Sequence, residues 1–246
     1  MFLKKLKISN FKNIEEKEFS FSQINCFVGN NGVGKTNILD AIYYLSFCKS
    51  FFNNNDFHSI RYEQDFFALH GFYDFKGVEE VYSCVLKRDG KKQMKYSQKS
   101  YNRLSEHIGK VPCVMIAPND HVLITGGSEV RRKFIDLIIS QQDKVYLQNL
   151  IRYNKAVEQR NKLLKSFQLY HYIDEVNLLI WEEQIALYGA CVQEKRKEFF
   201  KGFKQPMNDF YQFISQNKED VEIEYQTFEG DLLCLLKENR EKDKIV

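Results

Sequence analysis

The sequence of 246 residues predicts an α/β fold in which a phosphate-binding loop lies within a strand-rich first half, ahead of a helical second half. Three observations predict this fold. Apolar and polar residues alternate in the first half, apolar residues recur at helical spacing in the second, and a glycine-rich motif occupies residues 29–36. Hydrophobic residues make up 43% of the chain, which is enough for a buried core and excludes a wholly disordered protein.

The first half is predicted to consist mainly of strands. Residues 2–9 and 15–21 alternate on either side of a short polar stretch, which favours a hairpin. The apolar run at 24–28 ends at Gly29, as a buried strand would, and residues 38–47 are predicted to form a helix. β-branched and aromatic residues favour three further strands, at 66–73, 78–87 and 111–117.

The second half is predicted to be helical from Ser128, which is expected to be an N-cap. The clearest helix has apolar residues at heptad-like spacing, interrupted by Lys195. These residues are Leu178, Trp181, Ile185, Tyr188, Val192 and Phe199. Since each helix has one apolar stripe to bury, two or three long helices are expected to pack antiparallel. The change from sheet to helices is placed at 118–127.

The motif that carries chemistry fits the pattern G-x-x-x-x-G-K-[ST]. It consists of Gly29, Asn30, Asn31, Gly32, Val33, Gly34, Lys35 and Thr36. Glycines allow main-chain N–H groups to surround phosphates, and the following helix presents its positive dipole end to them. In this motif the lysine reaches the β- and γ-phosphates and the Thr36 hydroxyl ligates Mg²⁺. The sequence therefore predicts binding of a nucleoside triphosphate with Mg²⁺.

A complete hydrolase would also need a Walker B strand that ends in an acid. The nearest string is 178–183, but it belongs to the helical seam described above and is therefore interpreted as helix. The run 135–140 ends without an acid, and no signature sequence such as Ser-Gly-Gly-Gln is present. We therefore expect no complete ATPase active site in these residues, and no catalytic activity of the segment alone.

Several motifs together resemble the RecF family, whose N-terminal part is similar to the head of SMC-like ABC ATPases. The stretch 10–13, the phosphate-binding loop extended through Asn37, and residues 39–42 resemble the start of such a head. Further similar motifs follow in the family's order at 48–52, 117–120, 131–136, 153–165 and 181–186. One departure is Asn119, which stands where the family usually has an acid.

This resemblance implies an ABC-type P-loop ATPase head with an inserted antiparallel helical lobe. The expected divisions are an N-terminal part of the head at 1–120, a helical lobe at 121–215, and the start of a return segment at 216–246. The family's signature motif, Walker B strand and switch histidine would lie in a C-terminal part missing from this chain. Without those strands, the isolated segment is expected to be poorly soluble.

The resemblance also implies a function: an ATP-dependent, DNA-binding recombination mediator that acts at DNA gaps in repair and replication. It implies ATP and Mg²⁺ as cofactors and residues Gly29 to Asn37 as the nucleotide site. Implied partners are single-stranded, gapped or junction DNA, a RecR-type mediator, and a second copy in an ATP-dependent homodimer. A cytoplasmic location is expected, and no apolar run reaches the roughly 18 residues that a membrane span needs.

Two stretches, 87–110 and 129–165, are locally basic. Charge counts alone favour a solvated face opposite an apolar seam. The resemblance favours contact with DNA phosphates instead, with Arg131, Arg132 and Arg160 as the candidate residues. Lys12 and Asn13 either approach the nucleotide or form a simple turn.

Two other functions remain open from the sequence. The first is a P-loop kinase for a small substrate, in which the lysine-rich stretch 87–110 would act as a lid, although the long heptad seam has no role there. The second is a non-catalytic DNA-binding or assembly fragment with a vestigial P-loop. Phosphoryl transfer to a small acceptor would favour the first, and DNA binding indifferent to ATP and to Lys35 would favour the second.

Overall fold

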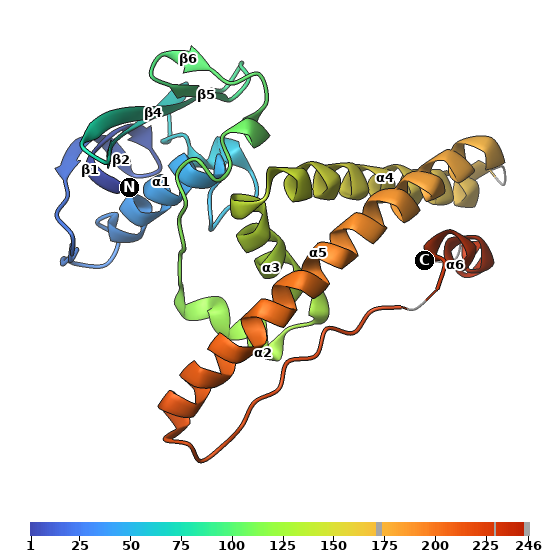
Figure 1. Ribbon diagram of the computed structural model, residues 1–246. Helices are drawn as coiled ribbons and strands as arrows, with labels where there is room; N and C mark the ends of the chain where they lie inside the picture. The colour runs from blue at the N-terminus through green and yellow to red at the C-terminus, as the bar shows by residue number, and fades with distance from the viewer. Residues whose placement is uncertain (171–173, 229, 244–246) are drawn as a thin grey trace. The chain divides into compact units, whose positions relative to one another are not determined.

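The computed structural model describes residues 1–170, 174–228 and 230–243, with side chains described up to 166 in the first of these ranges. The chain divides between His121 and Val122 into two compact units. The first unit is built around a β-sheet and the second consists of helices (Figure 1).

The N-terminal unit contains a six-stranded antiparallel sheet in the order β2-β1-β3-β4-β5-β6. Its strands are β1 (Phe2–Phe11), β2 (Ile14–Ser20), β3 (Phe66–Phe75), β4 (Val78–Lys87), β5 (Gln93–Tyr96) and β6 (Lys99–Ser100). The four strands predicted at 2–9, 15–21, 66–73 and 78–87 are confirmed, and the first two form the predicted hairpin. The same unit contains three short 3₁₀ helices: η1 (Asp56–Ser59), η2 (Leu104–Glu106) and η3 (Pro118–His121).

Helix α1 (Lys35–Phe47) covers one face of this sheet, and it confirms the helix predicted at 38–47. Alternate residues of the strands, such as Leu6 and Leu69, point towards α1 and are fully buried. From the helix, Tyr44 and Leu45 enter the same core. The sheet and α1 thereby hold the start of the helix, where the P-loop lies, in a fixed position.

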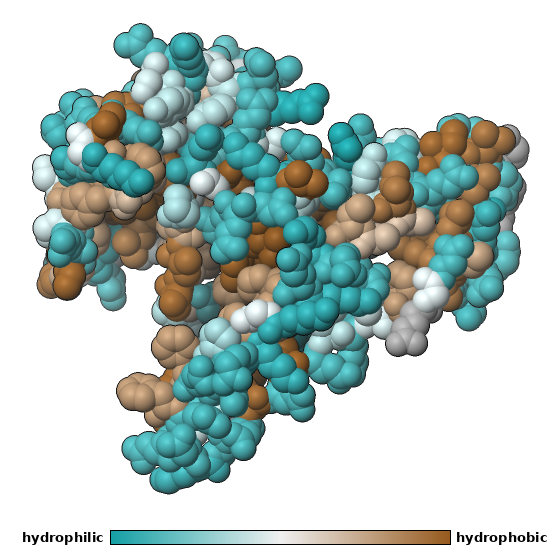
Figure 2. Space-filling model, viewed as in Figure 1, coloured by the Kyte–Doolittle hydropathy of each residue, from teal (hydrophilic) through white to brown (hydrophobic). Residues whose placement is uncertain are grey.

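The strands predicted at 24–28 and 111–117 are absent, so these two predictions are wrong. Both stretches are irregular, and Ile24 and Ile116 are 89% and 84% exposed. A strand needs a neighbour for its backbone N–H and C=O groups, and no strand among the described residues pairs with either stretch. An apolar run therefore favours a strand but does not supply its partner. Hydrophobic atoms reach the surface along the coil that leads to α2 (Figure 2).

The second unit contains α2 (Val122–Thr125), α3 (Ser128–Gln142), α4 (Lys144–Tyr170), α5 (Glu175–Ser215), α6 (Leu232–Glu238) and α7 (Arg240–Asp243). Helices α4 and α5 are antiparallel, as predicted, because Arg160 meets Glu182 while Tyr153, earlier in α4, meets Gly189, later in α5. A Cβ at Gly189 would lie 3.1 Å from the ring of Tyr153, so a glycine there allows the close approach. No helix among the described residues is long and apolar enough to cross a bilayer.

The heptad-like seam lies in α5, and its residues are buried or partly buried. Leu178, Ile185 and Val192 are 0 to 3% exposed, and the string 178–183 is helical, not a Walker B strand. Lys195, which interrupts the seam, is exposed and pairs with Asp143 of the chain segment before α4.

One detail of the helix start differs from the prediction. The N-cap of α3 is Gly127, without a side-chain hydrogen bond, and Ser128 is the first helical residue. Its hydroxyl accepts a hydrogen bond of 2.8 Å from Arg132 instead of capping the helix. Ser128 thus stabilises the first turn through a side chain one turn later and not through the backbone.

The predicted return segment runs back along α5 before α6 begins. Tyr225 stacks on Phe200 of α5 with ring centroids 5.2 Å apart, and Glu222 pairs with Lys204. Residues 229 and 244–246 of the predicted 216–246 segment lie outside the described residues.

Candidate nucleotide-binding site

The phosphate-binding motif forms a turn that opens directly into α1. Gly32 (φ +82°) and Gly34 (φ +103°) have left-handed backbone conformations, which residues with a Cβ rarely adopt. Gly34 is also the N-cap of α1, and a Cβ there would lie 2.8 Å from the side-chain oxygen of Asn13. The first N–H groups of α1 and its positive dipole end therefore face the turn, an arrangement that favours a bound anion.

Lys35 bends back over this turn. Its Nζ donates hydrogen bonds to the carbonyl oxygens of Gly29 (2.6 Å) and Asn30 (2.7 Å). An ammonium group has three donors, so one donor remains for a phosphate oxygen. Thr36 follows in the first helical turn and is exposed, which leaves its hydroxyl accessible to a divalent cation. The turn therefore offers the donors and the hydroxyl that Mg-ATP needs.

Asn13, in the turn between β1 and β2, is hydrogen-bonded to the phosphate-binding motif although it lies outside that motif in the sequence. Its side-chain nitrogen donates to the carbonyl oxygen of Gly32 (2.8 Å), and its side-chain oxygen accepts from Asn37 (2.8 Å). The structure thus joins Asn13 of the β1–β2 turn to Asn37 in the first turn of α1, 24 positions later in the chain. Asn31 and Val33, the remaining residues of the motif, are exposed on the turn.

A buried carboxylate fixes the base of the site. Asp40 of α1 is fully buried, pairs with Lys12 at 2.6 Å, and accepts hydrogen bonds of 2.7 Å from the hydroxyl of Ser50 and the backbone of Phe51. These bonds join the β1–β2 turn, α1 and the segment after α1. Because a buried charge is stable only when it is paired and hydrogen-bonded, this set constrains all three segments together. Lys12 is therefore a structural partner as well as a neighbour of the loop.

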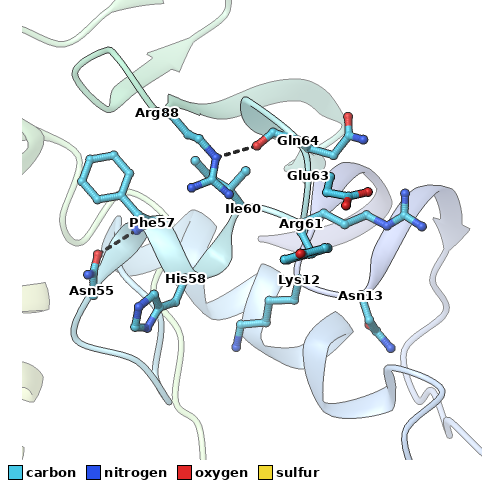
Figure 3. Close-up of a pocket in the computed structure, with 11 residues that line it drawn as sticks. Lys12, Asn13, Asn55, Phe57, His58, Ile60, Arg61, Glu63, Gln64 and Arg88 are labelled. Carbon is cyan, nitrogen blue, oxygen red and sulfur yellow. Dashed lines mark hydrogen bonds between the residues drawn. The ribbon is translucent and has the colours of Figure 1, made fainter.

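An open hollow of about 1050 Å³ borders the P-loop at Asn13 (Figure 3). Its wall comes from the β1–β2 turn, from η1 and the loop that follows it, and from the residue after β4. The lining residues are Lys12, Asn13, Asn55, Phe57, His58, Ile60, Arg61, Tyr62, Glu63, Gln64 and Arg88. Aromatic rings and basic groups around one hollow suit a nucleoside, which has a flat base and polar edges.

Two arginines lie in the wall of this hollow. Arg61 pairs with Glu15 at 3.0 Å, and Arg88 Nε donates to the carbonyl oxygen of Gln64 at 2.7 Å (Figure 3). Sequence reasoning missed Arg61, which belongs to no motif, and included Arg88 only as part of the basic stretch 87–110. Only the folded sheet brings the end of β4 beside the β1–β2 turn, where Lys12 and Asn13 lie.

Two of the three residues predicted to contact DNA lie at the start of α3. Arg131 and Arg132 are both exposed. Arg131 donates to the carbonyl oxygens of Leu123 (3.2 Å) and Gly126 (2.8 Å), which terminates α2, while Arg132 bonds Ser128. Neither is paired with a carboxylate in these bonds, so both guanidinium groups keep their positive charge available to phosphates.

Arg160 does not fit the prediction of a DNA contact. It is 5% exposed and lies between the buried carboxylate of Glu182 (3.2 Å) and Asp243 (2.9 Å). Arg240 also pairs with Glu182, at 2.5 Å. We call Arg160, Glu182 and Arg240 the ionic cluster. The charge of Arg160 is thus used to join α4, α5 and the C-terminal helices, and Arg160 is not retained as a DNA contact.

A second ion pair explains another of the family-like motifs. Asp136, in the motif at 131–136, accepts two hydrogen bonds from Arg196 (2.8 and 2.7 Å) and one from Tyr146 (2.5 Å). Burial opposes the charge on Arg196, but these hydrogen bonds to Asp136 raise its pKa overall. Asp136 therefore connects α3, α4 and α5 and is not an acid available for catalysis.

Comparison with known proteins adds to this geometry. A family profile described as an AAA ATPase domain matches residues 1–241. The chain is 52% identical over 251 residues to a DNA replication and repair protein RecF of Phocaeicola vulgatus, and it covers 67% of that relative. It is 45% identical to the RecF of Flavobacterium johnsoniae, of which it covers 69%.

Two solved structures are similar over 99% of this chain. One, described as the recombination mediator protein RecF-ATPrS in the RecFOR pathway, has a TM-score of 0.90 and 28% identity, and 69% of that chain is covered. The other, described as RecF-ATP in the same pathway, has a TM-score of 0.82 and 29% identity, with 65% of that chain covered. The chain thus spans about two thirds of the length of these relatives.

Proposed function

The chain belongs to the RecF family of DNA replication and repair proteins, and from this premise we propose that it binds DNA under the control of ATP and acts as a recombination mediator at DNA gaps. Its α/β fold is that of an ABC-type ATPase head, as the sequence predicts. The observation that carries the proposal is the P-loop turn, in which Gly32, Gly34 and Lys35 have the conformations and contacts that phosphate binding needs.

The nucleotide would be held in two parts. Backbone N–H groups of the turn and the ammonium of Lys35 would hold the phosphates, and the Thr36 hydroxyl would ligate Mg²⁺. The hollow beside Asn13 would receive the base and sugar, with Arg61 and Arg88 at its wall. A solved relative described with ATP supports ATP over other triphosphates as the ligand.

DNA would contact exposed basic residues, including Arg131 and Arg132. We infer that Mg-ATP joins two copies and that the joined state binds single-stranded, gapped or junction DNA, with a RecR-type mediator as the protein partner. Binding to DNA phosphates is electrostatic, so its affinity falls steeply as the salt concentration rises. This work would take place in the cytoplasm.

Hydrolysis needs an acid that activates water, and two carboxylates near the loop, Asp40 and Glu15, are already held in ion pairs. Asp40 is buried against Lys12, and Glu15 pairs with Arg61. We therefore propose that these residues bind ATP without turning it over by themselves. A steady-state assay that detects hydrolysis by this chain, lost in Lys35→Ala, would contradict this part of the proposal.

The central experiment measures DNA binding with and without Mg-ATP. Binding of a gapped oligonucleotide is expected to require Mg-ATP in the wild type. In Lys35→Ala, binding is expected to be weak both with and without Mg-ATP. Lys17→Ala removes an exposed lysine of the same unit that lies outside the P-loop and the basic stretches, and it is the matched control, which is expected to retain the ATP response. Nucleotide affinity is measured separately with a fluorescent ATP analogue.

Three other results would overturn the proposal in different ways. DNA binding that is indifferent to ATP and to Lys35 would leave a passive DNA-binding protein with a vestigial P-loop. Transfer of phosphate to a small acceptor, without any effect of DNA, would indicate a kinase. ATP binding without DNA binding would retain the nucleotide site and remove the mediator role.

A further inference from the structure

The sheet face opposite α1 carries a row of polar residues that the nucleotide site does not use. In the strand register, Lys7 of β1 is opposite His70 of β3, His70 is opposite Ser83 of β4, and Ser83 is opposite Lys95 of β5. A neighbour of each along its strand belongs to the buried core: Leu6, Leu69, Cys84 and Met94. Because side chains alternate along a strand, all four residues lie on the outer face. We call these four residues the Lys7–Lys95 row.

The spacing of the row places two lysines on either side of a polar centre. Adjacent strands lie about 4.8 Å apart, so the backbones of Lys7 and Lys95 are about 14 Å apart across the sheet. The Nδ1 atom of His70 lies 2.9 Å from the Ser83 hydroxyl, which fixes both side chains at the centre. Each lysine has a flexible four-carbon stem, which allows both ammonium groups to reach over the central pair.

The pKa of His70 is consistent with both lysines lying near its imidazole. Burial lowers the pKa of His70, and the positive charges of Lys7 and Lys95 lower it further. Both lysine charges therefore act on the imidazole from opposite strands. Such a point between two cations attracts an anion.

The acids near the row compensate only part of its charge. Glu18 of β2 pairs with both Lys5 and Lys7, each at 2.9 Å, so one carboxylate is shared by two lysines. Among the described residues, no carboxylate forms an ion pair with Lys95. Lys92, from the same basic stretch, differs because it pairs with Asp56 and is largely buried. The structure thus separates Lys95 from the lysines with structural roles.

We propose that the Lys7–Lys95 row binds a phosphate group of a nucleic-acid backbone. The inference rests on the DNA binding proposed above and assigns it a surface on the N-terminal unit. The row lies on an open sheet face and not in a cavity, which suits a phosphate displayed on an extended polymer. Lysine and serine side chains are common phosphate contacts that fix the position of a protein on DNA without reading sequence.

The test uses three variants of the full chain and a labelled single-stranded oligonucleotide, in the presence of Mg-ATP, at about 50 and 200 mM salt. Lys95→Gln is expected to lower the affinity several-fold and to reduce the slope of log K against log salt by about 0.7. Glu18→Gln is expected to raise the affinity, because it releases Lys5 and Lys7 from their ion pairs. Glu16→Gln is the control, because it removes the same charge from the same strand. Glu16 lies opposite Ser9 in the register, and the acid that pairs with Lys5 and Lys7 is Glu18.

The outcomes distinguish the row from the wider proposal. A wild type that binds no DNA overturns both. Wild-type binding that Lys95→Gln and Glu18→Gln leave unchanged overturns the row alone, as does an equal gain of affinity in Glu16→Gln, which would indicate a general charge effect. ATP affinity is expected to be the same in all variants, and inorganic phosphate at the concentration of oligonucleotide phosphate is expected to compete only weakly.

Discussion

The P-loop turn and the ionic cluster use charged side chains in opposite ways. Lys35 lies at the surface, bonds only to backbone carbonyls of its own loop, and has a donor left for a ligand. Arg160 is buried, and its charge is used by Glu182 and Asp243. Both were predicted from sequence to bind a ligand. The difference shows that a motif whose geometry is local predicts a functional lysine well, whereas a basic residue on a helix can be assigned only after the helix is packed.

The largest effect is expected at Glu182, the buried carboxylate of the ionic cluster. Glu182→Gln leaves Arg160 and Arg240 without their shared buried carboxylate, which should lower the free energy of unfolding by about 3 to 5 kcal/mol. Urea denaturation followed by circular dichroism measures the change. Glu183→Gln alters an exposed neighbour and should cost less than about 0.5 kcal/mol. Equal stability of the two variants would mean that the cluster does not stabilise the helical unit.

An intermediate effect is expected from His107, a buried group that no opposite charge compensates. Nε2 is 2.6 Å from the carbonyl oxygen of Leu45, Nδ1 has no partner among the described residues, and burial lowers the pKa of His107 to about 4. The unfolded state therefore binds more protons between about pH 6.5 and 4, so stability falls as the pH falls through that window, by up to about 3 kcal/mol.

The measurement compares the pH dependence of urea denaturation in the wild type and in His107→Gln. The variant keeps an amide that can donate to Leu45 but has no proton to gain, so its stability should fall less steeply below pH 6.5. The difference between the two profiles removes the contribution of the carboxylates, which is common to both. Parallel profiles would contradict a neutral, buried imidazole.

The smallest effect on folding is expected in the P-loop, where the effect on ligand binding is large. Gly34→Ala places a Cβ at a φ of +103° and 2.8 Å from Asn13, so the turn must shift. ATP affinity should fall at least about tenfold, at a cost in stability of about 1 kcal/mol. Gly32 also has a positive φ, but a Cβ there would have open space around it. Gly32→Ala therefore tests the backbone strain without the clash that Gly34→Ala adds. Unchanged ATP affinity in Gly34→Ala would break the comparison with the ionic cluster.

Local sequence patterns specify the features that depend on residues close together in the chain. Strand alternation in 2–21 and 66–87, the P-loop at Gly29 to Thr36 and the seam of α5 all follow from local periodicity or from a short motif. These patterns specify which face of an element is buried, or which backbone conformations a turn requires. The family resemblance also depends on such patterns, because motifs and their order can be recognised in the sequence without knowledge of contacts.

Tertiary structure decided the features that depend on partners far apart in the chain. The runs at 24–28 and 111–117 have strand-like composition but no neighbour to pair with, and Arg160 meets an acid 22 positions away. The hollow wall at Arg88 and the Lys7–Lys95 row arise only when the sheet sets its register. The physical reason is that these hydrogen bonds, ion pairs and buried contacts form between elements. A sequence shows which groups require a partner, but it does not identify that partner.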